Sequence, residues 1–563
     1  MKASRKVLLA VVATGVATFA AATVANSQNG PGFKTAQGPM IDPVAAGVSY
    51  EPIITVGDRL GGYMFESIPD GIALTKNGHG TVDVYVNHET STVPFPYTFN
   101  QATGTGSGFN DFTNSLVSKL RLHQRSGGVL QGSYAIQSDE NWQRFCSNYL
   151  ATEAEGFDRP MLLTNEEGID WVKRHGKAWP TTIGAADSRQ IGAVVAIDER
   201  SGKVQPIWGM GRLNHENAVP VPGYGKPVVL TGDDAFVSNP AQAQLYSYIA
   251  QDSDAVWHDD GDLWAFVGNG VEDYYDFAPG STMSVSGKFV KVPKDIATGR
   301  RPDATDLMAA DKGYPDPPDD GTWQRDARTN QGIDGPQWVL EHWGDTQPEK
   351  VFQFVRVEDI AYDRRPGMQN VVYVVDSGRG ATSAGGNAFT STNGRVWKLV
   401  LDKHDPTKVT SFSILIEGDD APVKAPNEIH QPDNIESTAH SLLVQEDPGS
   451  SQQFPLGSTD PNATTARIWQ YQLAAGTMRV VAKVNQSADE GPTDEDAAPA
   501  GNLGAWESSG IVDASSVFGH GAFLLDVQAG TLVIDEEVRQ EGHDTLTYQR
   551  DGGQLGLLRI PGA

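Results

Sequence analysis

The stretch Phe145-Cys146-Ser147-Asn148 is one of six short strings in which one functional side chain precedes small or polar residues and an apolar run. In the other five strings a carboxylate stands in the position of Cys146: Pro69-Asp70-Gly71-Ile72, His215-Glu216-Asn217-Ala218, Val357-Glu358-Asp359-Ile360, Pro432-Asp433-Asn434-Ile435 and Trp506-Glu507-Ser508-Ser509. Cys146 is the only cysteine of the chain. A thiolate brought together with several carboxylates makes a metal site more readily than a hydrophobic core.

Each string is followed by an apolar β run that ends in further acids, and a third β run closes each unit. The second runs are residues 83–89, 161–167, 228–234, 371–376, 442–447 and 523–526. The third runs are residues 116–122, 192–197, 244–249, 395–401, 467–473 and 554–560. Six units of antiparallel strands, none able to bury both faces alone, predict an all-β fold, a six-bladed β-propeller.

In a propeller the inner strands start near a central channel, so residues at equivalent strand starts converge there. We therefore expect a ring of Asp70, Cys146, Glu216, Glu358, Asp433 and Glu507, with the acids that end the second runs in a neighbouring layer. An insertion of roughly one hundred residues, about 251–350, separates the third and fourth units and predicts a lobe over one face. Residues 26–563 otherwise read as one domain, and residues 487–500 as a solvated loop.

The chain carries 71 acidic and 43 basic residues, a formal net charge of −28. This charge argues against a nucleic acid or an anionic membrane as a stable partner and makes divalent cations natural counterions. The 61 glycines and 33 prolines indicate many short strands joined by turns.

Residues 1–25 contain Lys2, Arg5 and Lys6 followed by a short apolar run, which is typical of a secretory signal peptide. The run fits either the general secretory route or a twin-arginine signal with Lys6 in place of the second arginine. We found no second apolar segment long enough for a membrane anchor. The prediction is an exported monomer, periplasmic or extracellular.

Carboxylates crowded at a channel mouth either become protonated or bind a cation. An oxygen-rich site suits Ca²⁺, whereas a thiolate points to a transition metal. Taken singly, each acid is better explained as an ordinary turn residue and Cys146 as a small buried hydrophobe. The aligned set of six positions favours metal binding instead. Arg356 lies two positions before Glu358, on the same face of a strand. It is either a salt-bridge partner of these acids or a bidentate fork for phosphate.

Across most of its length after the signal peptide the chain resembles the PhoX-type bacterial alkaline phosphatases. The resemblance rests on motifs that occur in the same order: Asn87-His88-Glu89, the cysteine followed by Thr164-Asn165-Glu166-Glu167, His215-Glu216, Thr231-Gly232-Asp233-Asp234 and Arg356-Val357-Glu358. Two positions depart from the family pattern. Val357 stands where the family has proline, and Asn165 stands where a second cysteine is common.

The resemblance implies a six-bladed propeller with an axial cluster of Ca²⁺ and Fe³⁺ that hydrolyses small phosphorylated substrates, phosphate monoesters, outside the cytoplasm. It implies a metal-bound oxide or hydroxide as nucleophile and Arg356 as the residue that binds and stabilises the phosphoryl group. The metal ligands that it implies are Glu89, Cys146 (on iron), Glu167, Glu216 and Glu358. The repeat register adds Asp433, Asn434 and Glu507 as further candidates.

Two other classes fit parts of the pattern. A propeller phytase or a calcium-dependent lactonase would share an acidic metal centre, but a lactonase would not need Cys146 or Arg356. A non-catalytic calcium-binding propeller for adhesion or recognition would not need Arg356 for anything beyond local stability. The histidines show no ligand-like clustering, and we predict structural roles for His88 and His215.

Overall fold

The computed structural model describes residues 30–94, 98–100, 102–173, 188–235, 240–318, 323–324, 332–378, 391–421, 425, 427–447, 464–486 and 506–563. The predicted signal peptide and the predicted loop at 487–500 lie outside these residues. Most of the described secondary structure is β-strand, as the sequence predicts, and the α-helices are short. In the described part of the chain, no helix combines the length and hydropathy needed to span a membrane.

The strands form six antiparallel units of four, and each predicted second and third run is a strand of its unit. In pairing order, the first unit is β5 (Pro69–Gly78), β6 (Thr81–His88), β9 (Leu116–His123) and β10 (Val129–Ile136), and the second is β11 (Phe145–Ala151), β12 (Met161–Glu166), β15 (Val194–Asp198) and β16 (Val204–Ile207). The third is β17 (His215–Pro220), β18 (Val228–Asp233), β19 (Leu245–Ile249) and β20 (Asp262–Gly268), and the fourth is β22 (Val357–Tyr362), β23 (Val371–Asp376), β24 (Arg395–Leu401) and β25 (Lys408–Glu417). The fifth is β26 (Pro432–Ser437), β27 (Ser441–Glu446), β28 (Arg467–Gln472) and β29 (Thr477–Val484), and the sixth is β30 (Trp506–Asp513), β31 (Ala522–Glu541), β32 (Asp544–Arg559) and β2 (Ser49–Thr55).

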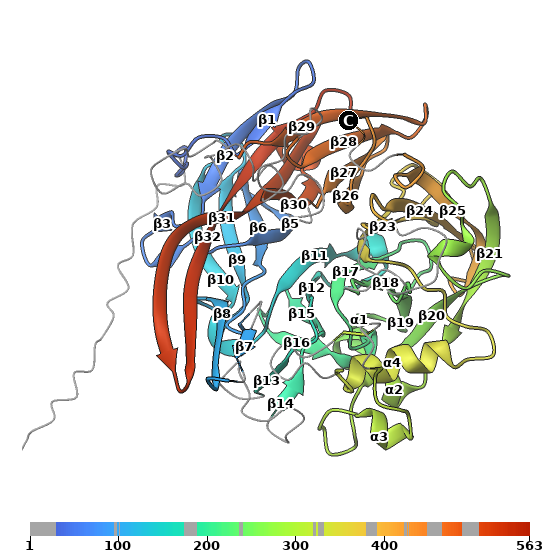
Figure 1. The fold of residues 1–563 in the computed structure, drawn as a ribbon. Coiled ribbons are helices and arrows are strands. Elements are labelled where there is room, and N and C mark those ends of the chain that lie inside the picture. Colours follow the sequence, from blue (N-terminus) through green and yellow to red (C-terminus); the bar gives the residue numbers. More distant parts are fainter. Residues whose placement is uncertain are drawn as a thin grey trace, which may run out of the picture.

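The first strands of the six units contact one another in a closed cycle, β5–β11–β17–β22–β26–β30 and back to β5. Figure 1 shows the labelled members of this set near the middle of the molecule, with the sheets fanning outward. The second strands are almost entirely buried, and some are nearly all apolar, as in the Val371–Asp376 sequence VVYVVD, because neighbouring sheets cover both of their faces. The channel at the centre is therefore surrounded by first strands from every unit.

The two ends of the described chain close this arrangement. β2 pairs antiparallel with β32, from Ser49 opposite Arg559 to Thr55 opposite Gln554, and supplies the fourth strand of the last unit. β1 (Ile41–Pro43) pairs with the outer edge of β29. Because an N-terminal strand completes a C-terminal sheet, the ring of units depends on a contact between residues about five hundred positions apart.

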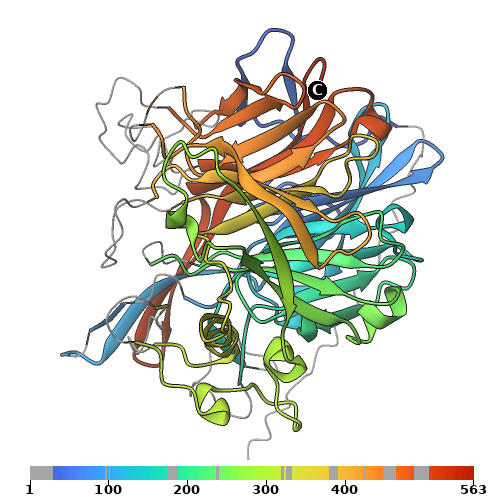
Figure 2. The same cartoon turned by 90° about the vertical axis from the view of Figure 1, so that its right-hand side faces the viewer.

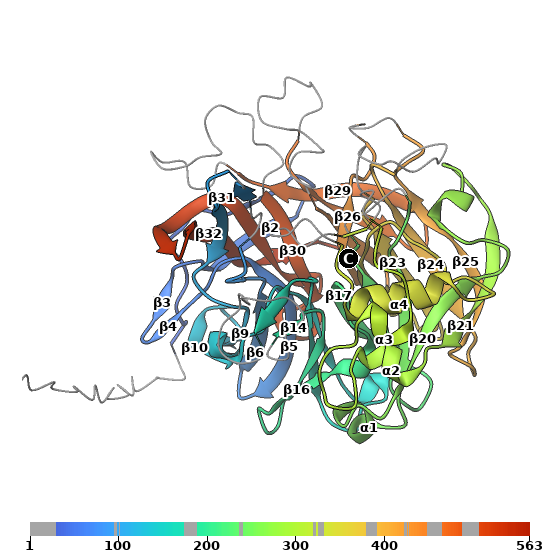
Figure 3. The same cartoon turned by 60° about the horizontal axis from the view of Figure 1, so that its bottom comes forward.

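The interval 251–350 is partly sheet and partly helical. Its β20 is the fourth strand of the third unit, and β21 (Ser284–Lys291) joins β20 to β25 of the fourth unit, giving a continuous nine-stranded sheet. Its helices are α1 (Ser253–Trp257), α2 (Lys294–Thr298), α3 (Ala309–Lys312) and α4 (Pro336–Asp345). Figure 3 shows α2, α3 and α4 grouped beside β20. The remaining helix is α5 (Ser515–Phe518).

Further short strands lie outside the six units. β3 (Arg59–Leu60) pairs with β4 (Tyr63–Met64), and β13 (Trp171–Lys173) pairs with β14 (Ser188–Gln190). β7 (Thr98–Asn100) and β8 (Thr105–Asp111) form a ribbon that leaves the first unit between β6 and β9. β8 then pairs in parallel with the extended β32 (Figure 1, blue beside red).

Candidate metal centre

A β-bulge at one repeated position directs the predicted ring residues into the channel. In five units, the residue before the ring position pairs with the last residue of the second strand. The next pair of opposite residues lies three positions further along the first strand but only two positions back along the second strand, so the first strand carries one extra residue. The two bulged residues are Asp70-Gly71, Cys146-Ser147, Glu216-Asn217, Glu358-Asp359 and Asp433-Asn434. The extra residue breaks the strict alternation of side chains along the strand.

The two bulged positions line two different cavities. The first residue of every pair lines an acidic cavity of about 410 Å³. The second residue of every pair lines another cavity of about 370 Å³. The prediction of a converging ring is thus supported for Asp70, Cys146, Glu216, Glu358 and Asp433, whereas the adjacent Asn434 is turned to the second cavity.

The sixth unit does not share this register. Its bulge lies at Gly510, between the pairings of Ser509 and Ile511, so Glu507 precedes the bulge by three positions. Glu507 still lines the acidic cavity, opposite Gln528 of β31. The expected sixfold equivalence therefore extends to five units, because strand pairing in the sixth unit places its irregularity elsewhere.

The paired acids at the ends of second strands have two separate roles. Glu167, Asp234 and Asp447 each follow a buried acid that accepts a hydrogen bond from a backbone amide of the loop entering the first strand. These bonds run from Gln143 to Glu166 (3.0 Å), from Asn214 to Asp233 (3.0 Å) and from His430 to Glu446 (2.8 Å). Glu167 and Asp447 line the acidic cavity, as does Glu89, the acid that follows β6. In these three pairs the acid beyond the strand end, and not the acid inside the strand, lies among the other candidate groups.

Four overlapping groups of side chains in and beside this cavity offer ligand atoms within 4.8 Å of one another. They are Asp70, Glu89 and Cys146; Cys146, Glu167 and Glu216; Glu167, Asp234 and Glu358; and Glu216, Glu358 and Asp433. Cys146 Sγ lies 3.2 Å from Asp70 Oδ2, and Asp70 Oδ1 is buried without a hydrogen-bond partner among the described residues. A donor set of carboxylates and one thiolate fits hard and borderline metal ions together.

The charge of the cavity supports the same interpretation. Ten carboxyl groups and two arginines line it. Burial, reinforced by neighbouring carboxylates, raises the pKa values of Glu167, Glu216, Asp433 and Glu507 well above the ordinary range. Burial also raises the pKa of the Cys146 thiol. These groups remain protonated unless a cation compensates for the lost hydration of their charged forms.

Arg356 lies against this cluster, as the two-residue spacing from Glu358 predicts. Its Nε and Nη2 donate to Asp234 at 2.7 Å each, Nη2 lies 3.0 Å from Glu358 Oε1, and Nη1 donates to Asp447 at 3.1 Å. Although burial lowers the pKa of Arg356, Asp234 and Glu358 hold it well above its usual value. The guanidinium is thus permanently charged and positioned among the candidate ligands.

Arg144 is a second cavity arginine that the sequence reading missed. It lies two residues before Cys146, as Arg356 lies two residues before Glu358, and it pairs with Asp170. The Arg144 backbone has a φ of 45°. Its side chain lies beside Gly168: a Cβ at that position would be 3.0 Å from Arg144 Nη1, and only Ile191 would be nearer. The repeated position before the ring residue was the signal that could have identified it.

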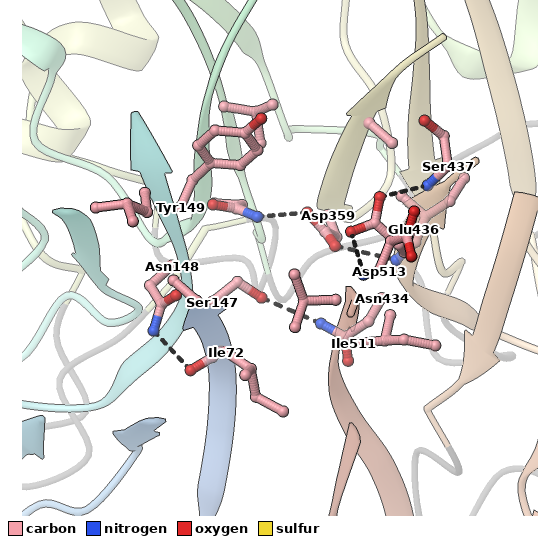
Figure 4. A pocket seen from close by; sticks show the side chains of 18 of the residues that line it. Ile72, Ser147, Asn148, Tyr149, Asp359, Asn434, Glu436, Ser437, Ile511 and Asp513 are labelled. Carbon is pink, nitrogen blue, oxygen red and sulfur yellow. Dashed lines mark hydrogen bonds between the residues drawn. The ribbon is translucent and has the colours of Figure 1, made fainter. Parts of the chain in front are cut away.

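The second cavity differs in chemistry from the first (Figure 4). Asn434 Nδ2 donates across the channel to Ser147 Oγ at 3.1 Å, and Ser147 Oγ donates to Glu216 at 2.8 Å. Asp359 accepts from Asn217 at 2.5 Å and from the Ile435 amide at 3.0 Å. Because donors already surround Asp359, this acid offers less to a cation than the acids of the first cavity.

His88 and His215 are both buried with both ring nitrogens engaged. His88 contacts Ser67 O at 3.0 Å and Ser118 Oγ at 2.7 Å. His215 contacts Thr231 Oγ1 at 2.7 Å and Gly211 O at 3.2 Å. Burial lowers the pKa of His88 to about 4 and that of His215 to about 3, so both are neutral and serve to join strands.

Among solved structures, the chain is similar to Pseudomonas fluorescens PhoX in complex with vanadate, a transition state analogue, with 14% identity, a TM-score of 0.56, and coverage of 94% of this chain and 98% of that one. This likeness concerns the fold. A family 117 glycoside hydrolase, Zg3597 of the marine bacterium Zobellia galactanivorans, matches at 11% identity and a TM-score of 0.30, covering 79% of this chain and 92% of that one. No curated protein sequence matches. The family described as alkaline phosphatase PhoX matches residues 132–490, more than half of the chain. The protein therefore belongs to the PhoX alkaline phosphatase family and is a phosphatase.

Proposed function

We propose that this protein is a metal-dependent phosphatase that hydrolyses small phosphate monoesters in the acidic cavity. The observation that carries the proposal is the position of Arg356, a permanently charged fork held against four overlapping groups of candidate metal ligands. Phosphoryl transfer needs positive charge arranged around the phosphoryl oxygens, and this cavity can supply it from both an arginine and bound cations.

The proposed metal ligands are Glu89, Cys146, Glu167, Glu216, Glu358, Asp433 and Glu507 from the sequence, with Asp70 and Asp234 added from the geometry. We leave Asn434 out because it faces the second cavity. The carboxylates suit Ca²⁺, and the Cys146 thiolate suits Fe³⁺. When bound, such ions lower the pKa of coordinated water and neutralise charge on phosphoryl oxygens.

In this proposal the two arginines bind the phosphate. Asp234 occupies the Nε and Nη2 edge of Arg356, the edge that would make a bidentate contact with phosphate. Asp234 and Glu358 also belong to one candidate ligand group, so a cation bound there competes with Arg356 for their charge. Arg356 would then turn its donors to the phosphoryl oxygens, with Arg144 adding a second positive charge in the same cavity.

For the rest of the molecule we infer a six-bladed β-propeller, a single domain of residues 26–563 with an inserted lobe within about 251–350, outside β20. Support comes from the closed cycle of six first strands. Residues 1–25 would be a signal peptide that directs a monomer to the periplasm or the exterior. The alternative functions, a lactonase or an adhesive calcium-binding propeller, explain less well why Cys146 and Arg356 line one cavity.

The test is hydrolysis of p-nitrophenyl phosphate by the purified protein with Ca²⁺, with and without iron, for the wild type and Arg356→Gln. We expect kcat/KM of the variant to fall by about 100- to 1000-fold, the usual cost of losing one transition-state donor. Arg121→Gln is the matched control, because Arg121 makes a two-pronged ion pair with Asp83 outside the cavity. Full activity of Arg356→Gln would refute the proposed role, and wild-type protein without activity under all metal conditions would refute the function.

A further inference from the structure

One wall of the acidic cavity is built by segments that extend beyond the six four-stranded units. β31 and β32 continue beyond their sheet as a long hairpin, paired from Val533 opposite Asp551 to Glu541 opposite Asp544. β8 pairs in parallel with the hairpin, from Ser107 opposite Thr545 to Asp111 opposite Gln549. Figure 2 shows the blue ribbon and the red hairpin projecting together from the body of the molecule. Both elements lie outside the segment that matches the family, residues 132–490.

Polar contacts fix this wall in place beside the cavity. Arg550 Nε donates to Glu66 at 3.0 Å, and its Nη1 donates to Asp535 at 2.8 Å. On the ribbon side, Asp111 accepts from the Ser91 amide at 2.7 Å. Because the hairpin is tied to the segment before β5 and the ribbon to the segment after β6, the wall holds a defined position relative to the candidate ligands.

The wall turns an aromatic ring and two acids toward the same space. Phe109, Asp111, Gln549 and Asp551 line the acidic cavity together with Val93. Phe109 is 48% exposed, and it is the one large exposed hydrophobic residue of the described chain that also lines this cavity. An aromatic face at the mouth of a polar cavity is suited to stacking against a planar apolar group.

We propose that this wall is the subsite for the organic part of the substrate, and that it selects phosphate monoesters of aromatic alcohols with no second anionic group. The proposal rests on the proposed function, because it places the phosphoryl group near Arg356. The cavity, at about 410 Å³, is at the small end for organic ligands and suits one or two rings. Asp111 and Asp551 lie beside Phe109 and offer no positive charge to a further phosphate or carboxylate there.

The experiment compares kcat/KM for phenyl phosphate and ethyl phosphate in the wild type and Phe109→Ala. We expect the preference for the phenyl ester to fall by about 3- to 10-fold in the variant, in keeping with one aromatic contact. Phe109→Trp should retain the preference. Val538→Ala is the control, because Val538 is exposed on the hairpin of the same wall but does not line the cavity. An equal change for both esters, or no change, would overturn the subsite.

A binding measurement separates this proposal from the function on which it rests. Phenylphosphonate and methylphosphonate cannot be hydrolysed as esters, so calorimetric titration reports binding alone. Tighter binding of phenylphosphonate to the wild type, lost in Phe109→Ala, supports the subsite even if turnover of both esters is absent. Equal affinity for the two phosphonates, or no binding of either one, would overturn it.

Discussion

At the scale of single residues, adjacent acids in this protein have opposite fates. Asp233 accepts a backbone hydrogen bond from Asn214, while its neighbour Asp234 holds Arg356 through two bonds of 2.7 Å. The same division separates Glu166, which is paired with Arg189, from the cavity residue Glu167. Backbone amides thus engage the acid inside the strand, whereas the acid beyond the strand end belongs to the candidate ligand groups, where Asp234 is shared with Arg356.

Cys146 offers the sharpest test of metal identity. We expect Cys146→Ser to lower the iron content at least about 10-fold while calcium is retained, because a hydroxyl is a poor replacement for a thiolate on iron. Elemental analysis of both purified proteins measures this. The variant removes every thiol of the chain, so no other cysteine can compensate. Iron bound equally by both proteins would contradict the assignment of Cys146.

Asp551 gives a prediction about pH. Burial raises its pKa to about 7, so it is neutral below that pH and charged above it. Ionisation adds negative charge beside the anionic substrate, and KM should therefore rise as pH increases through about 7. We expect the ratio of wild-type KM to that of Asp551→Asn to grow about 2- to 5-fold between roughly pH 6 and 8.5. Ionisation of the substrate changes both KM values in the same way, so its effect cancels in this ratio. A ratio independent of pH would contradict this role of Asp551.

At the scale of elements, the bulges allow neighbouring first strands to approach one another closely. A Cβ on Gly71 of β5 would lie 2.3 Å from the Asn148 amide nitrogen and 2.5 Å from the Ser147 carbonyl carbon of β11. Asn148 Nδ2 also donates to Gly71 O at 2.6 Å. The channel side of β5 therefore requires a residue without a side chain at this crossing.

Gly71→Ala should destabilise the protein by about 1–3 kcal/mol, because the added methyl group meets backbone that cannot rotate away. Gly62→Ala is the matched control, since a Cβ there has no heavy atom within 4 Å, and its effect should stay within about 0.5 kcal/mol. Urea unfolding of the three proteins measures both changes. Equal stability of the two variants would show that β5 can shift away from β11.

At the scale of the whole molecule, repulsion between the carboxylates of the acidic cavity opposes closure of the ring of first strands. Residues from all six units bring ten carboxyl groups to one space with two arginines. A cation that binds there joins units that are otherwise held by contacts between their first strands. Folding and metal binding should therefore be coupled.

We expect calcium to raise the melting temperature and EDTA to lower it. At a free concentration about 100-fold above Kd, each bound ion adds about 2.7 kcal/mol of stability. Glu358→Gln should lose part of this gain, since Glu358 belongs to two of the ligand groups. Glu349→Gln is the control, because Glu349 is an exposed partner of Lys288. Calorimetric melting curves that coincide with and without calcium would contradict the coupling.

The sequence alone was sufficient for every feature that depends on local pattern. Alternating and continuously apolar runs located the second and third strands, and five of the six ring positions follow from the repeated string. Arg356 and Glu358 share a face because strands have a period of two residues. The ordered motifs also indicated the PhoX family, which the match over residues 132–490 confirms.

Only the tertiary structure decided which side of a bulge a residue faces and which distant strands pair. Asn434 follows Asp433 directly, yet it lines the other cavity, because the bulge is defined by pairing with β27. Glu507 lies at a different register, set by β31. The ribbon of β8 joins β32 across more than four hundred residues, an edge-to-edge pairing that no local pattern encodes. The sequence thus determined the repeated strands and the chemistry that they carry, whereas pairing between distant strands determined the shape of the cavity, because it depends on which backbone edges the folded sheets leave open.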